Sequence, residues 1–142
     1  MTTIISKLIK NLHEYDQQRR REIIKQQGTS KLADAPDKLL FYVFKGECEE
    51  RARIILFLIK NKALSQRDDY HYAASIIINV GNLEYFKLAY KLIKKYRKLG
   101  GKGKWGFYDT YFERQKWGKS REEVYREIAK EIGMDPNKLD KF

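Results

Sequence analysis

The segment LEYFKLAYKLIKKYRKL, residues 83–99, decides the fold class of this chain. Its apolar residues recur at the three- and four-residue spacing of an α-helix and fall on one side. They are Tyr85, Phe86, Ala89, Leu92, Ile93 and Tyr96. Lysines follow the other side at helical spacing: Lys87, Lys91, Lys94 and Lys98. The segment predicts an amphipathic helix with one face in a core and a lysine face toward solvent.

The same periodicity extends through most of the 142 residues and predicts an all-α protein. No Asn-Gly or Asp-Gly turn lies between alternating runs, so we expect no strand pair. About six to seven helices are expected, packed as stacked helical hairpins in one compact domain over residues 1–142. We expect an N-terminal helix over 3–27, a loop over 28–36, a helical core over 37–133 and a short C-terminal helix over 135–142.

Several residues are typical of helix ends. Thr3 is expected to cap the first helix, and Gly28 to end it. Asp68 or Asp69 is the expected N-cap of a helix over residues 68–80. Gly100 is expected to end the amphipathic helix over residues 83–99.

A glycine is also expected to separate two helices after the loop over 28–36. Helices are expected over 37–44 and 47–61, separated near Gly46. On the second of these, Arg51 and Arg53 are expected on the solvent side. Cys48 is surrounded by acidic residues in the sequence, which disfavours a reactive thiolate.

Positive charge is concentrated in one part of the chain. Residues 87–121 contain twelve Lys/Arg and two acids, a net +10 out of the total of +11. Such a concentration favours a polyanionic partner, with RNA or DNA first. The predicted binding residues are Lys87, Lys91, Lys94, Lys98, Lys102, Lys104 and Trp105. Two other interpretations stay open: an ordinary solvated helix face with Trp105 in the core, and a basic helix on an anionic membrane surface.

The C-terminal residues 128–142 have the apolar spacing of a helix-turn-helix, with Gly133 at the turn. Its second helix would end with the chain at Phe142 and would begin with the acidic Asp135, whereas a recognition helix presents its N-terminal residues to DNA. A helical cap that closes the core is the simpler interpretation.

An enzymatic role would rest on His71 together with Asp68, Asp69 or Asp109. No His-x-x-x-His or Cys-x-x-Cys spacing accompanies them, so we predict no catalytic residue, no metal site and no cofactor. The single cysteine excludes an intramolecular disulfide. The longest apolar run, residues 54–59, is too short to span a bilayer, and the N-terminus lacks the features of a signal peptide. We therefore expect a cytoplasmic protein.

Two resemblances add to this interpretation. Residues 73–111 resemble a tetratricopeptide (TPR)/Sel1-like unit, through small residues at helix crossings and the aromatics Tyr96, Trp105, Tyr108 and Tyr111. This resemblance implies TPR-like hairpins that form a surface for proteins or peptides.

A longer stretch resembles a bacterial family of all-helical domains of unknown function. The resemblance runs from YDQQR at 15–19 through DYHYAA at 69–74, LAY at 88–90, Gly100 and Trp105 to DTYF at 109–112 and Gly118-Lys119. Where the family pattern has Gln-His-Gly, this chain has Asn79-Val80-Gly81, and it departs again at Thr110 and Arg121. The resemblance implies a helical fold, supplies no activity and weakens an enzymatic interpretation.

The sequence thus favours a non-enzymatic binding module whose basic face takes nucleic acid or another polyanion. A helical adaptor for an acidic protein partner is the alternative, followed by a helix-turn-helix DNA-binding protein and by an enzyme that uses His71.

Overall fold

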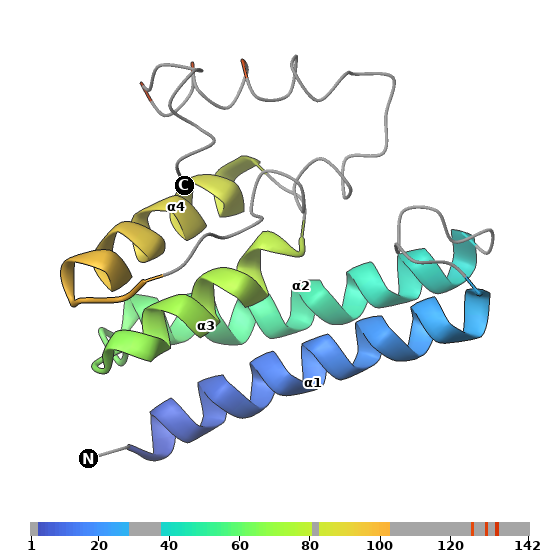
Figure 1. Ribbon diagram of the computed structural model, residues 1–142, viewed down its shortest axis with the longest axis horizontal. Coiled ribbons are helices and arrows are strands. Elements are labelled where there is room, and N and C mark those ends of the chain that lie inside the picture. The colour runs from blue at the N-terminus through green and yellow to red at the C-terminus, as the bar shows by residue number, and fades with distance from the viewer. Residues whose placement is uncertain are drawn as a thin grey trace.

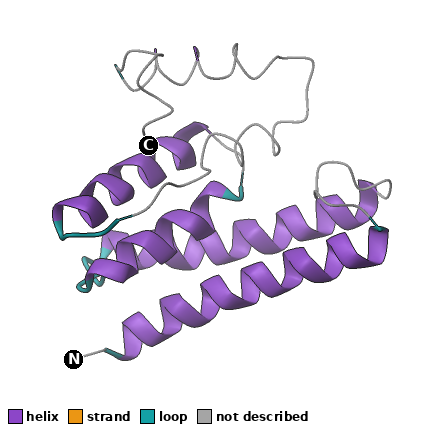
Figure 2. Cartoon of the chain, in the orientation of Figure 1, coloured by secondary structure: helices purple, strands orange, loops and turns teal. Residues whose placement is uncertain are grey.

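The computed structural model describes residues 3–28, 38–80 and 83–102, together with Arg126, Lys130 and Gly133. The described residues form four α-helices (Figure 1). They are α1 (Ile4–Gln27), α2 (Lys38–Lys60), α3 (Arg67–Ile78) and α4 (Leu83–Lys98). No strand occurs among these residues, only helices and turns (Figure 2), which confirms the predicted all-α class. None of the described helices is long and apolar enough to cross a bilayer.

α3 is the central element of the described structure. It packs against α1, α2 and α4, and most extensively against α4. α1 and α2 lie antiparallel to each other, and α4 runs antiparallel to α3 (Figure 1). Two small residues of α3, Ala73 and Ala74, are fully buried, which lets the neighbouring helices approach its backbone closely. Whether these helices stack in the TPR manner stays a prediction.

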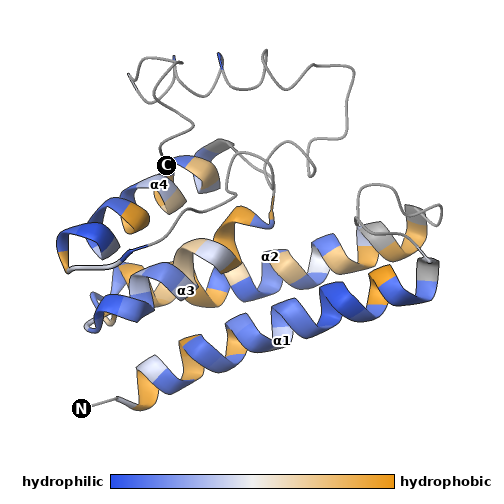
Figure 3. Ribbon diagram, viewed as in Figure 1, coloured by the Kyte–Doolittle hydropathy of each residue, from blue (hydrophilic) through white to orange (hydrophobic). Residues whose placement is uncertain are grey.

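All four helices contribute apolar side chains to one core. Its largest fully buried members are Ile9, Phe44, Ile55, Ile76, Ile77, Phe86 and Ile93. Each such side chain contributes about 1.5–3 kcal/mol through removal from water. Figure 3 shows hydrophobic residues in every helix, whereas α1 is mostly hydrophilic on the face in view. In α1, therefore, only part of the helix surface packs into the core.

Both ends of α1 confirm the sequence-based expectation. The Thr3 side chain accepts a hydrogen bond from the backbone N–H of Ser6 at 2.9 Å. Gly28 ends the helix in the left-handed conformation, at φ 68°, which glycine adopts without a steric penalty. α4 likewise ends before Gly100, which has φ 93°. The caps read from the sequence thus set these boundaries.

The division of the second helical region at Gly46 is wrong, because α2 runs through this residue without a break. Phe44 and Cys48, on either side of it, are both buried on the same face of the helix. A glycine inside a helix costs about 1 kcal/mol relative to alanine, less than the burial of Phe44 alone contributes. The described residues consequently hold four helices instead of the five predicted for them, and do not reach the total of six to seven.

The predicted N-cap of α3 is also wrong. Gln66 precedes the first helical residue, Arg67, and Asp69 occupies the third position of the helix. From there, Asp69 Oδ2 accepts hydrogen bonds from the backbone N–H groups of Ser65 and Gln66 at 3.0 and 2.9 Å. It also accepts one from Ser6 Oγ of α1 at 3.0 Å. The carboxylate therefore satisfies the start of α3 and ties it to α1.

A buried carboxylate joins three helices in the interior. Asp16 of α1 is fully buried, and its Oδ1 accepts a hydrogen bond from Arg51 Nε of α2 at 2.8 Å and forms an ion pair with Arg51 Nη2 at 2.7 Å. Its Oδ2 accepts one from Nδ2 of Asn79, the C-cap of α3, at 2.6 Å. The prediction that Arg51 faces solvent is therefore wrong, because Arg51 pairs with a charge that the sequence does not mark as buried. Arg53 is exposed, as expected.

Gly46→Ala is expected to raise the free energy of unfolding by about 0.5–1 kcal/mol, because alanine loses less backbone entropy in a helix. An added Cβ would meet no atom within 4 Å. Chemical denaturation measures the change. Gly28→Ala is the matched control and should be destabilising, because its φ of 68° strains an L-residue. A destabilising Gly46→Ala would contradict a continuous α2.

Asp16→Ala is expected to lower the free energy of unfolding by about 3–5 kcal/mol, because it leaves the Arg51 guanidinium buried without its counter-charge. Glu14→Ala, two residues away and paired with Lys10 at 4.0 Å on the surface, should cost at most about 1 kcal/mol. Urea denaturation of both variants makes the comparison. Equal, small losses would show that the Asp16 network does not hold the helices together.

Candidate functional site

The amphipathic division of α4 holds in the structure. Phe86, Ala89, Leu92, Ile93 and Tyr96 are buried, as the sequence predicts. Tyr85 is partly buried against the same core. Because this face packs against α3, the orientation of α4 about its own axis is set by the core. The opposite face must therefore point outward.

That outward face carries lysines along its whole length. We call it the lysine face of α4 and define it as Lys87, Lys91, Lys94, Lys95 and Lys98. The last four of these lysines are exposed, and Lys87 is partly buried. At 3.6 residues per turn these positions fall within an arc of about 100°, over about 16 Å of helix. The structure thus places together the four lysines predicted on this helix.

Sequence reasoning missed one member of the lysine face. Lys95 is exposed and lies on the same arc, four residues after Lys91. The four-residue spacing that identifies Lys91 from Lys87 would also have found it. With Lys95 included, two consecutive turns of α4, residues 91–94 and 95–98, each carry two lysines of the lysine face.

Few acceptors balance this charge within α4. Glu84 is the only acid of the helix, and its carboxylate lies 3.7 Å from Lys87 Nζ. Lys94 Nζ lies 5.0 Å from the centre of the Tyr90 ring, a cation–π distance. Burial raises the pKa of the Tyr90 phenol, which keeps that side chain neutral. Lysines at i+4 repel one another by a few tenths of a kcal/mol per pair, so the face would be relieved by an anion.

The remaining predicted binding residues fall beyond the helix. Lys102 is exposed, and its backbone carbonyl accepts a hydrogen bond from the Tyr96 hydroxyl at 3.4 Å. Lys104 and Trp105 lie outside the described residues, as do Asp109 and the predicted helix-turn-helix at 128–142, apart from Lys130 and Gly133. Among the described residues of α4, the rings of Phe86, Tyr90 and Tyr96 are buried. The lysine face therefore offers charge but no ring for base stacking.

The two candidate acids that the structure describes, Asp68 and Asp69, each pair with a group other than an imidazole. The Asp69 carboxylate accepts a hydrogen bond from the backbone N–H of Gln66 at the start of α3. The Asp68 carboxylate lies 3.0 Å from Arg67 Nε on the surface. His71 lies among aromatic rings, and its pKa is lowered to about 4 by burial, with His13 adding to the effect. No group of three metal-binding side chains occurs in the part of the chain that is described.

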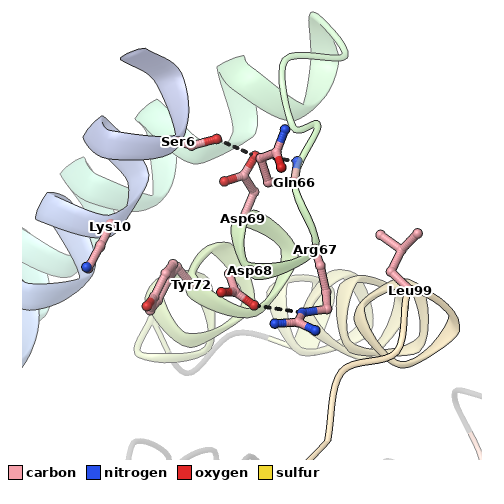
Figure 4. A pocket seen from close by; sticks show the side chains of 8 residues that line it. All are labelled: Ser6, Lys10, Gln66, Arg67, Asp68, Asp69, Tyr72 and Leu99. Atoms are coloured by element: carbon pink, nitrogen blue, oxygen red, sulfur yellow. Dashed lines mark hydrogen bonds and ion pairs between the residues drawn. The ribbon is translucent and has the colours of Figure 1, made fainter. Parts of the chain in front are cut away.

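A cavity of about 420 Å³ opens between α1, the start of α3 and the end of α4. Figure 4 shows the eight residues that line it: Ser6, Lys10, Gln66, Arg67, Asp68, Asp69, Tyr72 and Leu99. Both carboxylates of the lining have partners within it: Asp69 accepts a hydrogen bond from Ser6, and Asp68 pairs with Arg67 (Figure 4). The lining matches no single ligand charge, so the lysine face is the stronger candidate site.

Arg19, the first residue of the basic run at 19–21, contributes to packing between helices. Arg19 Nη2 and Nε lie 2.9 and 3.1 Å from the two carboxylate oxygens of Glu47 on α2. Hydrogen bonds to Glu47 and Glu22 raise the pKa of the Arg19 guanidinium. Arg19 therefore joins α1 to α2, and its charge is paired there.

Cys48 lies in the interior and is fully buried. Its Sγ is 3.6 Å from Asp16 Oδ1 and 3.5 Å from Arg51 Nη2. The thiol thus belongs to the buried Asp16 network.

No family model, curated protein or solved structure matches this chain.

Proposed function

We propose that this protein binds polyanions, nucleic acid first, through the lysine face of α4. The observation that carries the proposal is the alignment of Lys87, Lys91, Lys94, Lys95 and Lys98 on one outward arc of a helix whose other face is held in the core. The helix contains six basic residues and one acid. A fixed row of cations attracts a partner with a row of anions more strongly than it attracts a single small ion.

A phosphate backbone fits this row better than base edges or stacked bases do. Ammonium groups are point charges that neutralise phosphates and release counterions. Neither the fork of an arginine nor an exposed ring accompanies the exposed lysines on the arc, and Tyr90 is held beneath Lys94. The proposed contacts therefore position a backbone without reading its sequence.

Binding to a DNA duplex of about 20 base pairs should fall steeply with salt. Contacts to four or five phosphates predict a loss of affinity on the order of 100- to 500-fold between about 50 and 200 mM salt. Replacing Lys91, Lys94 and Lys98 by Gln should lower the slope of log affinity against log salt by about three. Replacing the same three residues by Glu should abolish binding. Fluorescence anisotropy measures all of these.

The matched control places the same change of charge elsewhere. Lys7, Arg21 and Arg53 are exposed on α1 and α2, and their joint replacement by Glu alters the net charge equally. This variant should retain most of the affinity, and circular dichroism should show that both Glu variants remain helical. Equal losses in the two variants would mean that net charge, and not the lysine face, attracts the ligand.

Absence of binding to duplex and single-stranded nucleic acid at low salt would overturn the nucleic-acid proposal. If, in addition, one acidic protein were retained from a nuclease-treated lysate and lost with the Lys91, Lys94 and Lys98 reversal, the alternative of a helical adaptor would replace it.

A further inference from the structure

The only two histidines of the chain lie side by side although 58 positions separate them. The rings of His13 on α1 and His71 on α3 have their centres 5.9 Å apart. Tyr72 of α3 lies against both, at 4.9 Å from His13 and 5.0 Å from His71. The ring centre of Tyr96 of α4 lies 5.4 Å from that of His71. We call these four residues the histidine cluster; it is where α1, α3 and α4 meet.

The cluster suits neutral imidazoles. Nδ1 of His13 is buried and has no hydrogen-bond partner in the described structure. A neutral ring tolerates one bare nitrogen, whereas an imidazolium carries N–H on both nitrogens and needs an acceptor for each. Protonation of His13 would therefore bury an unpaired donor. Protonation of both rings would also set two like charges about 6 Å apart in a poorly solvated place.

Nearby acids do not remove this penalty. Glu14 and Asp16 favour a charged His13, but burial outweighs them and its pKa is lowered. The Asp16 charge is already taken up by Arg51 of α2. On α3, Asp68 favours a charged His71, yet burial and His13 together lower the His71 pKa to about 4. The residue that α4 contributes to the cluster is the aromatic ring of Tyr96.

We propose that the histidine cluster is an acid-sensitive latch that holds α1 against α3 and α4. Above neutral pH the neutral rings pack together and the latch is closed. On acidification the unfolded or opened chain takes up protons more readily than the closed one, so protons drive the three helices apart at this point. The latch works independently of the proposed function, because no lysine of the lysine face belongs to it.

The sign and size of the effect follow from the pKa values. A folded-state pKa of about 4 for His71, against 6.5 when exposed, means that stability is complete above pH 6.5 and is lost as pH falls toward 4. Between about pH 8 and pH 5 the equilibrium constant for opening should rise about 30-fold through His71 alone. His13 adds to this.

The test follows both imidazoles by two-dimensional NMR in the folded wild-type protein while denaturation curves are recorded at each pH. His71 should remain neutral to below pH 5, and amide protection in α1 should fall more steeply with acid than in α2. His71→Phe keeps a ring between Tyr72 and Tyr96 and should flatten the pH profile of stability. His13→Phe should raise the pKa of His71, because it removes the like charge that His13 would carry once protonated in acid.

A His71 that titrates near 6.5 in the folded protein would overturn the proposal, and so would a His71→Phe variant with the wild-type pH profile. The NMR titration needs no variant, so it decides the question even if a substitution prevents folding. Loss of nucleic-acid binding in the lysine variants has no bearing on either readout.

Discussion

The burial of one carboxylate constrains the described structure more than any other single interaction. Asp16 has no access to water, so its charge must be matched by protein donors. Arg51 of α2 and Asn79 at the end of α3 supply them at 2.6–2.8 Å. Removal of either partner leaves a charge or a dipole unsatisfied. The network therefore sets the register of α1, α2 and α3 relative to one another, whereas apolar contacts alone would tolerate sliding.

The position of the lysine face follows from this arrangement through α3. α3 is held against α1 at its start by Asp69 and near its end by Asn79. α4 packs its apolar face against α3, so the lysines on its opposite face point outward. The surface proposed to bind polyanions is thus a consequence of core packing. Its charges repel one another mildly, a cost that the burial of Phe86 and Ile93 exceeds.

Much of the local structure was predictable because it depends on neighbours in the sequence. The caps at Thr3 and Gly28, the end of α4 at Gly100 and the buried stripe of α4 all follow from spacing and residue type. The error at Gly46 has a cause that is not local. Gly46 looked like a break because its local cost is visible, whereas the buried Phe44 and Cys48 that outweigh it are recognised only in the folded core.

The same distinction between local and distant contacts applies to the charged residues. The sequence predicted the cations of α4 by their period, and Lys95 was within reach of the same rule. Periodicity could not show that Arg19 pairs with Glu47, or that His13 and His71 meet, because these pairs lie 28 and 58 residues apart. Only the packing of α1 against α2 and α3 brings them within contact.

By itself, the sequence determined that the chain is helical, where α1 and the end of α4 are capped, and which side of α4 is basic. These properties arise from interactions over three or four residues, which a pattern of residue types encodes directly. The tertiary structure alone decided that Asp16 and Arg51 are buried together, that α2 continues through Gly46 and that two histidines share one site. Each of these balances a local cost against contacts between distant segments, and only the folded chain contains both sides of that balance.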